Sequence, residues 1–111
     1  MYTFDLDAVR RAMDAMDSKW KEFMRGETLS MGVYRLKAGE PDLQKPHTED
    51  EVYVVLRGRA SFVAGENQQA VSGGTVIFVE AGRDHRFVDI VEDLEAFVLF
   101  TPSEGSKAPT Q

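Results

Sequence analysis

The stretch from Glu27 to Thr101 constrains the fold most, because apolar and polar residues alternate along it in short segments. Alternation with a period of two, together with many Val, Ile, Phe, Tyr and Thr residues, indicates β-strands. Glycine and other turn-forming residues separate the segments at short intervals. Such a chain, with no helical segment inside it, predicts an antiparallel sandwich or barrel. We expect strands at residues 28–37, 52–56, 60–64, 70–72, 75–79, 85–88 and 94–101.

Residues 5–22 show helical spacing instead. One face of this segment collects the apolar residues Leu6, Val9, Met13, Met16 and Trp20. The stripe can be a packing face against the rest of the domain or a seam for a partner helix. We favour packing, because a single helix of this length is rarely stable alone.

The chain has 111 residues, which is the length of one domain, and 42% of them are apolar, enough to form a core. We expect residues 1–25 to form a helix that packs on the barrel and residues 26–101 to form the barrel itself. Residues 102–111 are rich in Ser, Gly, Pro and Thr, so we expect a disordered tail there.

Charge and composition narrow the choice of partner. Thirteen Lys and Arg against nineteen Asp and Glu give a net charge of −6, which argues against nucleic-acid and anionic-membrane partners. The longest apolar runs, 52–56 and 96–100, are far shorter than the ~20 residues of a membrane helix. The acidic first residues do not read as a signal peptide, and the absence of cysteine fits a reducing compartment. We therefore expect a cytoplasmic protein with a small-molecule ligand or substrate.

The chain has two histidines, His47 and His85, so any histidine chemistry must use one or both of them. If the backbone is extended before the strand at 52–56, alternate residues share one face: Lys45, His47, Glu49, Glu51 and Tyr53. A hairpin that brings His85 opposite His47 and Glu51 would assemble two imidazoles and a carboxylate. Such a set, with coordination positions left open, suits a divalent transition metal, and Fe(II) is the metal most associated with it.

These two stretches resemble the paired motifs of the cupin superfamily. In the first motif, six residues separate Glu51 from Gly58, and His47 falls on the second histidine of the His-x-His pair. The second motif is matched in register at three positions: Gly74, Gly82 and His85. Glu80 stands where a proline is usual, and Asp89 stands where an asparagine is usual.

The resemblance implies a small single-domain cupin, which folds as a double-stranded β-helix (a jelly-roll barrel), here with an N-terminal α-helix. It also implies a divalent transition metal ion inside the barrel, with His47, Glu51 and His85 as its ligands. The metal would be Fe, Mn, Ni, Cu or Zn, and the sequence does not choose among them.

One departure from the motif concerns the metal site. Lys45 occupies the place of the first histidine, and an ammonium cannot ligate a metal unless it loses a proton whose usual pKa is about 10.4. Glu49 has the parity to replace the missing ligand, and Gln44 would need a shifted register. Lys45 can instead point out of the barrel, or pair with Glu49 or an anionic substrate. Tyr53 would line the pocket or pack in the core.

Two functions remain open at this point. Three protein ligands leave positions for substrate and for water or dioxygen, as a metal-dependent enzyme needs. The resemblance allows dioxygenase or isomerase activity on a small organic substrate. A non-catalytic binding or sensing module, with or without metal, would use the same barrel.

Sheet edges in a small open barrel must be covered, and the N-terminal helix or a second subunit can cover them. The resemblance also implies a homodimer. We expect deletion of residues 1–22 to expose apolar surface and cause aggregation, which light scattering would detect. A truncated protein that remains monodisperse and equally stable would show that the helix is dispensable.

Overall fold

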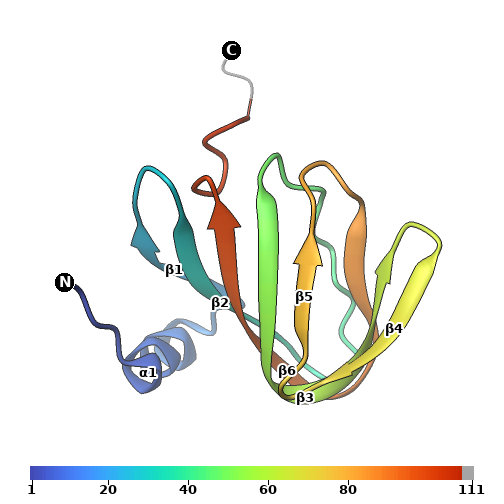
Figure 1. Ribbon diagram of the computed structural model, residues 1–111. Helices are drawn as coiled ribbons and strands as arrows, with labels where there is room; N and C mark the ends of the chain where they lie inside the picture. The colour runs from blue at the N-terminus through green and yellow to red at the C-terminus, as the bar shows by residue number, and fades with distance from the viewer. Residues whose placement is uncertain (109–111) are drawn as a thin grey trace.

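A computed structural model describes residues 1–108 of the chain as one helix and a six-stranded antiparallel sheet that curls into a barrel (Figure 1). Neighbouring strands follow the order β1-β2-β6-β3-β4, and β5 pairs with β3. The predicted mainly β barrel with an N-terminal helix is confirmed. The elements are α1 (Leu6–Met16), β1 (Trp20–Arg25), β2 (Ser30–Leu36), β3 (Asp50–Ala64), β4 (Asn67–Ser72), β5 (Val76–Val79) and β6 (His85–Thr101).

The two longest strands, β3 and β6, form the frame of the barrel. They pair with each other from Asp50 opposite Thr101 to Ala64 opposite His85. The first part of β3 also pairs with β5, and its last part pairs with β4. We predicted two strands in place of each of these, and that prediction was wrong. Both strands continue through their turn-like residues, with shifts of register that bend the sheet.

Gly58 marks the bend in β3. Its φ is +99°, and a Cβ atom at this position would lie 2.4 Å from the carbonyl oxygen of Asp93. Only glycine adopts this φ without strain and allows β6 to pass so close. Gly58, which suggested the end of a strand, therefore lies within β3, where it allows β6 to pass close to it.

The core lies inside the barrel, because alternate residues of the long strands point inward. Tyr53, Phe87 and Phe100 are its largest fully buried side chains. The buried core cluster consists of Leu36, Tyr53, Val55, Ala60, Phe62, Val71, Val79, Phe87, Ile90, Leu94, Ala96, Val98 and Phe100.

The helix prediction was wrong beyond Met16. Asp5 caps the N-terminus of α1 by accepting a hydrogen bond from the backbone of Asp7, and Asp17 ends the helix in the left-handed conformation. Trp20 begins β1, where it lies opposite Tyr34 of β2, so strand pairing overrides its helical spacing. Within residues 1–108, no helix has both the length and the apolar character to cross a membrane.

The apolar stripe is therefore shorter than predicted. Val9 and Met13 are buried against Val33 on the outer side of the sheet, whereas Met16 is 78% exposed. Trp20 packs against the core inside the barrel instead. The packing of the helix on the barrel thus depends on its first two turns.

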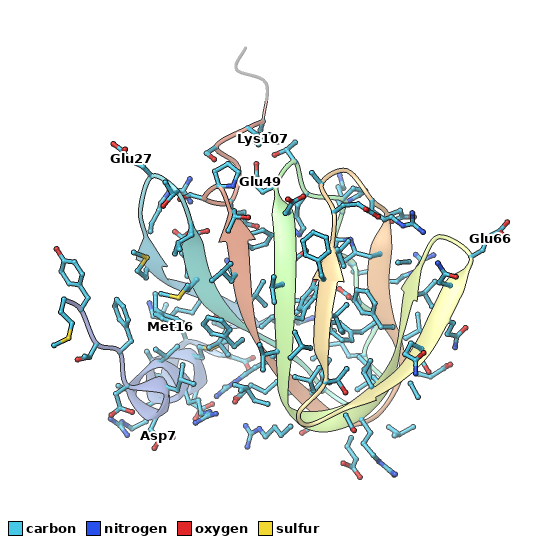
Figure 2. All side chains as sticks on the ribbon, viewed as in Figure 1. Asp7, Met16, Glu27, Glu49, Glu66 and Lys107 are labelled. Atoms are coloured by element: carbon cyan, nitrogen blue, oxygen red, sulfur yellow. The ribbon has the colours of Figure 1, made fainter. Side chains whose placement is uncertain are left out.

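The segment after β6 differs from the disorder expected for residues 102–111. Residues 104–107 form a turn, and the buried hydroxyl of Ser103 donates to the Leu29 carbonyl. The backbone N–H groups of Gly105 and Lys107 donate to the buried Glu49 carboxylate at 2.7 and 3.1 Å. Figure 2 shows Glu49 and Lys107 near each other at one end of the molecule. Residues 109–111 lie outside the described part of the chain.

The Glu95 carboxylate is one of the polar links between the helix and the sheet. The buried Glu95 side chain lies between Arg35 and Arg57 on the neighbouring strands and within 2.7 Å of Arg10 of α1. Burial would raise the pKa of Glu95, but the hydrogen bond from Arg10 and the charges of Arg57 and Arg35 outweigh burial and lower it.

Replacement of Glu95 by Gln should lower the free energy of unfolding by about 2 kcal/mol at neutral pH, the scale of charge-assisted hydrogen bonds. Because the pKa of Glu95 is lowered on folding, its contribution is present above about pH 4.3 and is lost as the pH falls through the lowered pKa. Urea unfolding at neutral pH and at about pH 3 should therefore show a smaller difference from wild type in acid.

Glu92→Gln is the matched control. Glu92 lies on β6, as Glu95 does, and forms an exposed pair with Arg59 of β3, so its replacement should change stability by less than about 0.5 kcal/mol. Equal destabilisation by Glu95→Gln at both pH values would contradict an electrostatic role for Glu95.

Candidate metal centre

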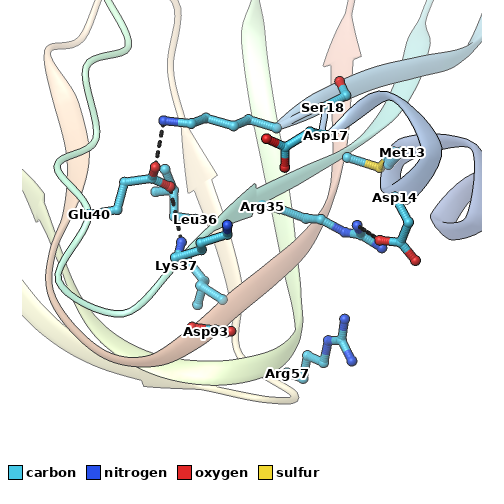
Figure 3. Close-up of a pocket in the computed structure, with 12 residues that line it drawn as sticks. Met13, Asp14, Asp17, Ser18, Arg35, Leu36, Lys37, Glu40, Arg57 and Asp93 are labelled. Carbon is cyan, nitrogen blue, oxygen red and sulfur yellow. Dashed lines mark hydrogen bonds and ion pairs between the residues drawn. The ribbon is translucent and has the colours of Figure 1, made fainter.

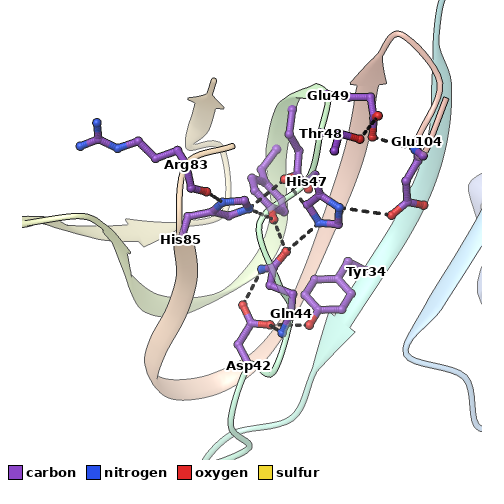
Figure 4. A network of polar contacts seen from close by, with 12 residues as sticks. Tyr34, Asp42, Gln44, His47, Thr48, Glu49, Arg83, His85 and Glu104 are labelled. Carbon is purple, nitrogen blue, oxygen red and sulfur yellow. Dashed lines mark hydrogen bonds and ion pairs between the residues drawn. The ribbon is translucent and has the colours of Figure 1, made fainter. Parts of the chain in front are cut away.

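The structure brings His47, Glu51 and His85 together at one end of the barrel (Figure 4). Each offers one ligand atom, and these atoms all lie within 4.8 Å of one another. His85 Nε2 is 2.8 Å from Glu51 Oε1, and His47 Nε2 is 3.9 Å from the same oxygen. Glu51 and His85 are buried, and His47 is half-buried. The residues predicted as a metal site are thus neighbours in space.

The backbone places these three side chains. Glu51 lies at the start of β3, with its side chain pointing into the barrel, and His85 is the first residue of β6. His47 lies in the loop before β3, and its carbonyl accepts a 2.7 Å hydrogen bond from the Gly82 N–H. This bond ties the turn before His85 to the loop that carries His47.

The proton positions on His85 prepare one nitrogen for a ligand. His85 Nδ1 lies 2.7 Å from the Arg83 carbonyl, which can only accept, so Nδ1 carries a hydrogen. Burial lowers the pKa of His85, but hydrogen bonds with Glu51 and Arg83 and the charge of Glu51 outweigh burial and raise it. Nε2 therefore faces Glu51 and binds either a proton or a metal ion there.

Glu51 Oε1 is the atom that most suits a cation. It is buried and lacks a hydrogen bond of good geometry, although His85 Nε2 lies within ion-pair distance. A buried carboxylate oxygen needs a positively charged or hydrogen-bonding partner, which either a protonated His85 or a bound metal ion would supply. The donor set of two imidazoles and one carboxylate fits a divalent transition metal.

His47 is oriented by the segment that follows the barrel. Its Nδ1 lies 3.5 Å from Glu104 Oε2, which leaves Nε2 to face Glu51. Carboxylates on the outer nitrogen commonly fix metal-binding histidines in this way. Burial raises the pKa of Glu104, and the neighbouring Glu22 and Glu51 raise it further, against the opposing effect of His47. No sequence signal identified Glu104, because composition alone predicted disorder there.

Of the other predicted site residues, Tyr53 reaches the site. Its hydroxyl lies 3.2 Å from His85 Nε2 and donates to Gln44 Oε1 at 2.9 Å. Burial and the charge of Glu51 raise its pKa, so the phenol stays protonated. Lys45 is exposed and does not line the cavity.

The structure does not bring Glu49 to the ligand cluster. Its oxygens accept from Thr48 and from the backbone of Gly105 and Lys107, and these bonds lower its pKa although burial opposes them. The prediction that alternate residues from 45 to 53 share one face is wrong for residues 45–49. These residues precede the strand, which begins only at Asp50.

A cavity of about 270 Å³ adjoins the cluster. Its walls combine aromatic, apolar and polar side chains with two of the three candidate ligands, His47 and Glu51: Trp20, Tyr34, Gln44, His47, Glu51, Tyr53, Val98, Phe100 and Glu104. Periodicity assigned Trp20 to a helix, so its place in this wall was missed. The cavity gives the open side of the cluster room for a small molecule.

A larger pocket of about 430 Å³ lies between the end of α1 and the far end of the barrel (Figure 3). Its charged residues pair with one another, as in the contacts Lys19–Glu40 at 2.7 Å and Arg35–Asp14 at 2.5 Å. It contains neither histidine, so the chemistry favours the smaller cavity.

The barrel, the glycine positions and this cluster together define a class of protein. The family described as "Cupin domain" matches residues 32–101, and the chain belongs to that family. Metal binding is common among cupins.

Comparison with known proteins gives close and distant relatives. The chain is 42% identical to "Uncharacterized protein SCO3923" of Streptomyces coelicolor over 105 residues, which is 95% of this chain and 100% of the relative. The structure is similar to that of BH2720 from Bacillus halodurans (TM-score 0.77, 18% identity, 99% and 83% of the two chains). It is also similar to an RmlC-like cupin from Desulfovibrio desulfuricans (TM-score 0.63, 23% identity, 76% and 81%). These two likenesses show the fold alone.

Proposed function

We propose that this cupin holds a divalent transition metal on His47, Glu51 and His85 and acts on a small organic molecule in the adjoining cavity, in a reaction of the dioxygenase or isomerase type. The observation that carries the proposal is the convergence of two imidazole nitrogens on the buried Glu51 Oε1 at the cavity wall. A bound Fe, Mn, Ni, Cu or Zn ion would polarise a substrate oxygen or bring dioxygen to it.

Other residues of the chain would orient the ligands, contact the substrate and hold a proton. The Arg83 carbonyl orients His85 and Glu104 orients His47, so both Nε2 atoms face the same point. Trp20 and Phe100 offer apolar contact to the organic part of a substrate and exclude water from the site. Glu104, with its raised pKa, can hold a proton beside the cavity. The acidic, cysteine-free composition supports a cytoplasmic location.

The test is the metal content of the protein purified without an affinity tag and loaded with each candidate metal. Wild type should hold about one ion per chain, and His47→Ala, Glu51→Gln and His85→Ala should each lose most of it. Chelation should lower the melting temperature of wild type alone, because an ion that binds only the folded state stabilises it.

Lys45→Ala is the matched control, because Lys45 lies in the same loop as His47 but is exposed. It should keep the metal. A wild-type protein that takes up no metal and is indifferent to chelation would overturn the proposed function.

We also propose a homodimer formed through the outer face of β5. Val76 and Phe78 are 64% and 63% exposed there, and they lie beside the half-buried Val54 and Val52 of β3. An apolar surface of this kind favours association with a second copy.

Phe78→Asp should convert the dimer into a monomer in sedimentation-equilibrium measurements, because a charge would be buried without a partner. Val91→Asp, at a position of similar exposure on β6, should leave the dimer intact. A monomeric wild type, or dissociation by both variants alike, would argue against this face.

A further inference from the structure

Gln44 is the polar residue of the cavity that the three-ligand site leaves unexplained. Its side chain is half-buried, and Oε1 lies 3.4 Å from His47 Nε2 and 2.9 Å from the Tyr53 hydroxyl (Figure 4). Tyr53 in turn lies 3.2 Å from His85 Nε2. The Gln44 oxygen thus approaches the ligand atoms from the loop side.

Asp42 fixes which end of the Gln44 amide faces the site. The amide nitrogen of Gln44 donates to Asp42 Oδ2 at 2.6 Å, and the same oxygen accepts from the backbone of Phe87 at 2.9 Å. Asp42 Oδ1 accepts from the Tyr34 hydroxyl at 2.6 Å. A buried carboxylate can only accept, so the amide cannot turn over without losing this bond, and Oε1 must point toward the histidines.

The distances also suit coordination. Ligand atoms about 2.1 Å from a shared ion lie about 3.0 Å apart at right angles and about 3.4 Å apart in a tetrahedron. The separation of Gln44 Oε1 from His47 Nε2 is 3.4 Å. An amide oxygen has two lone pairs, so one can accept from Tyr53 while the other faces the ion.

We propose that Gln44 is a fourth protein ligand of the metal, through Oε1. This inference rests on the proposed metal site at His47, Glu51 and His85. The loop supplies the ligand one residue before Lys45, the residue that occupies the missing histidine position. Two oxygens and two imidazole nitrogens form a harder donor set than three imidazoles and a carboxylate, which favours Mn(II) and Fe(II) over softer ions.

The alternative is that Gln44 acts only as a hydrogen-bond acceptor that positions Tyr53. The two roles differ in what happens when each residue is replaced singly. Loss of a ligand lowers metal affinity and changes the coordination of the ion, whereas loss of a tyrosine hydroxyl outside the coordination sphere leaves the coordination unchanged.

The experiment is titration of the purified protein with Co(II), followed by the visible absorption bands of the ion and by competition with a chelator. Gln44→Leu keeps the approximate volume and removes the oxygen, and we expect an affinity at least about tenfold lower with altered bands. Gln69→Leu is the matched control on the exposed β4 strand and should match wild type.

Wild-type affinity and unchanged bands in Gln44→Leu would overturn the inference while leaving the metal site in place. The same would follow if Tyr53→Phe reproduced both effects. If Gln44→Leu fails to fold, as judged by circular dichroism, Gln44→Ala replaces it with the same expectations. Failure of wild type to bind Co(II), Mn(II) or Fe(II) would overturn the proposed metal site and this inference with it.

Discussion

The pairing of β3 with β6 along nearly their whole lengths is the constraint on which the rest of the molecule depends. This one ladder runs from Asp50 opposite Thr101, next to Glu51, to Ala64 opposite His85 at its other register limit. Because each strand bends, β3 and β6 both run through the two halves of the barrel. Glu51 and His85 are distant in the ladder, yet the curvature brings their side chains to 2.8 Å.

Much of the fold could be predicted from the sequence, because period-two alternation reports which side of a strand is buried. Alternation does not show whether a glycine ends a strand or bends it, and for Gly58 only the approach of Asp93 decides that question. The local sequence pattern also could not predict where the helix ends. Trp20 satisfies the helical spacing, but pairing with Tyr34 gives it a strand partner and a place inside the barrel.

The candidate site was likewise predictable from the sequence only in part. Spacing identified His47, Glu51 and His85, because motif residues in strands and tight turns keep a fixed register. Spacing offered Gln44 only with a shifted register, and it did not identify Asp42, which lies in the same irregular loop, or Glu104, which lies beyond the last strand. Gln44 and Glu104 line the cavity and are held by specific polar contacts, which do not produce a periodic pattern in a sequence.

The hydrogen bond from Gly82 to the His47 carbonyl has a consequence for how this turn can vary. It is a bond between main-chain atoms, so the two histidines keep their relative positions whatever side chains the turn carries. Gly82 itself must remain, since its φ is +78°, but Glu80 projects into solvent. A proline at that position would stiffen the turn without adding a contact to the ligands. The turn therefore accommodates an acidic residue at position 80.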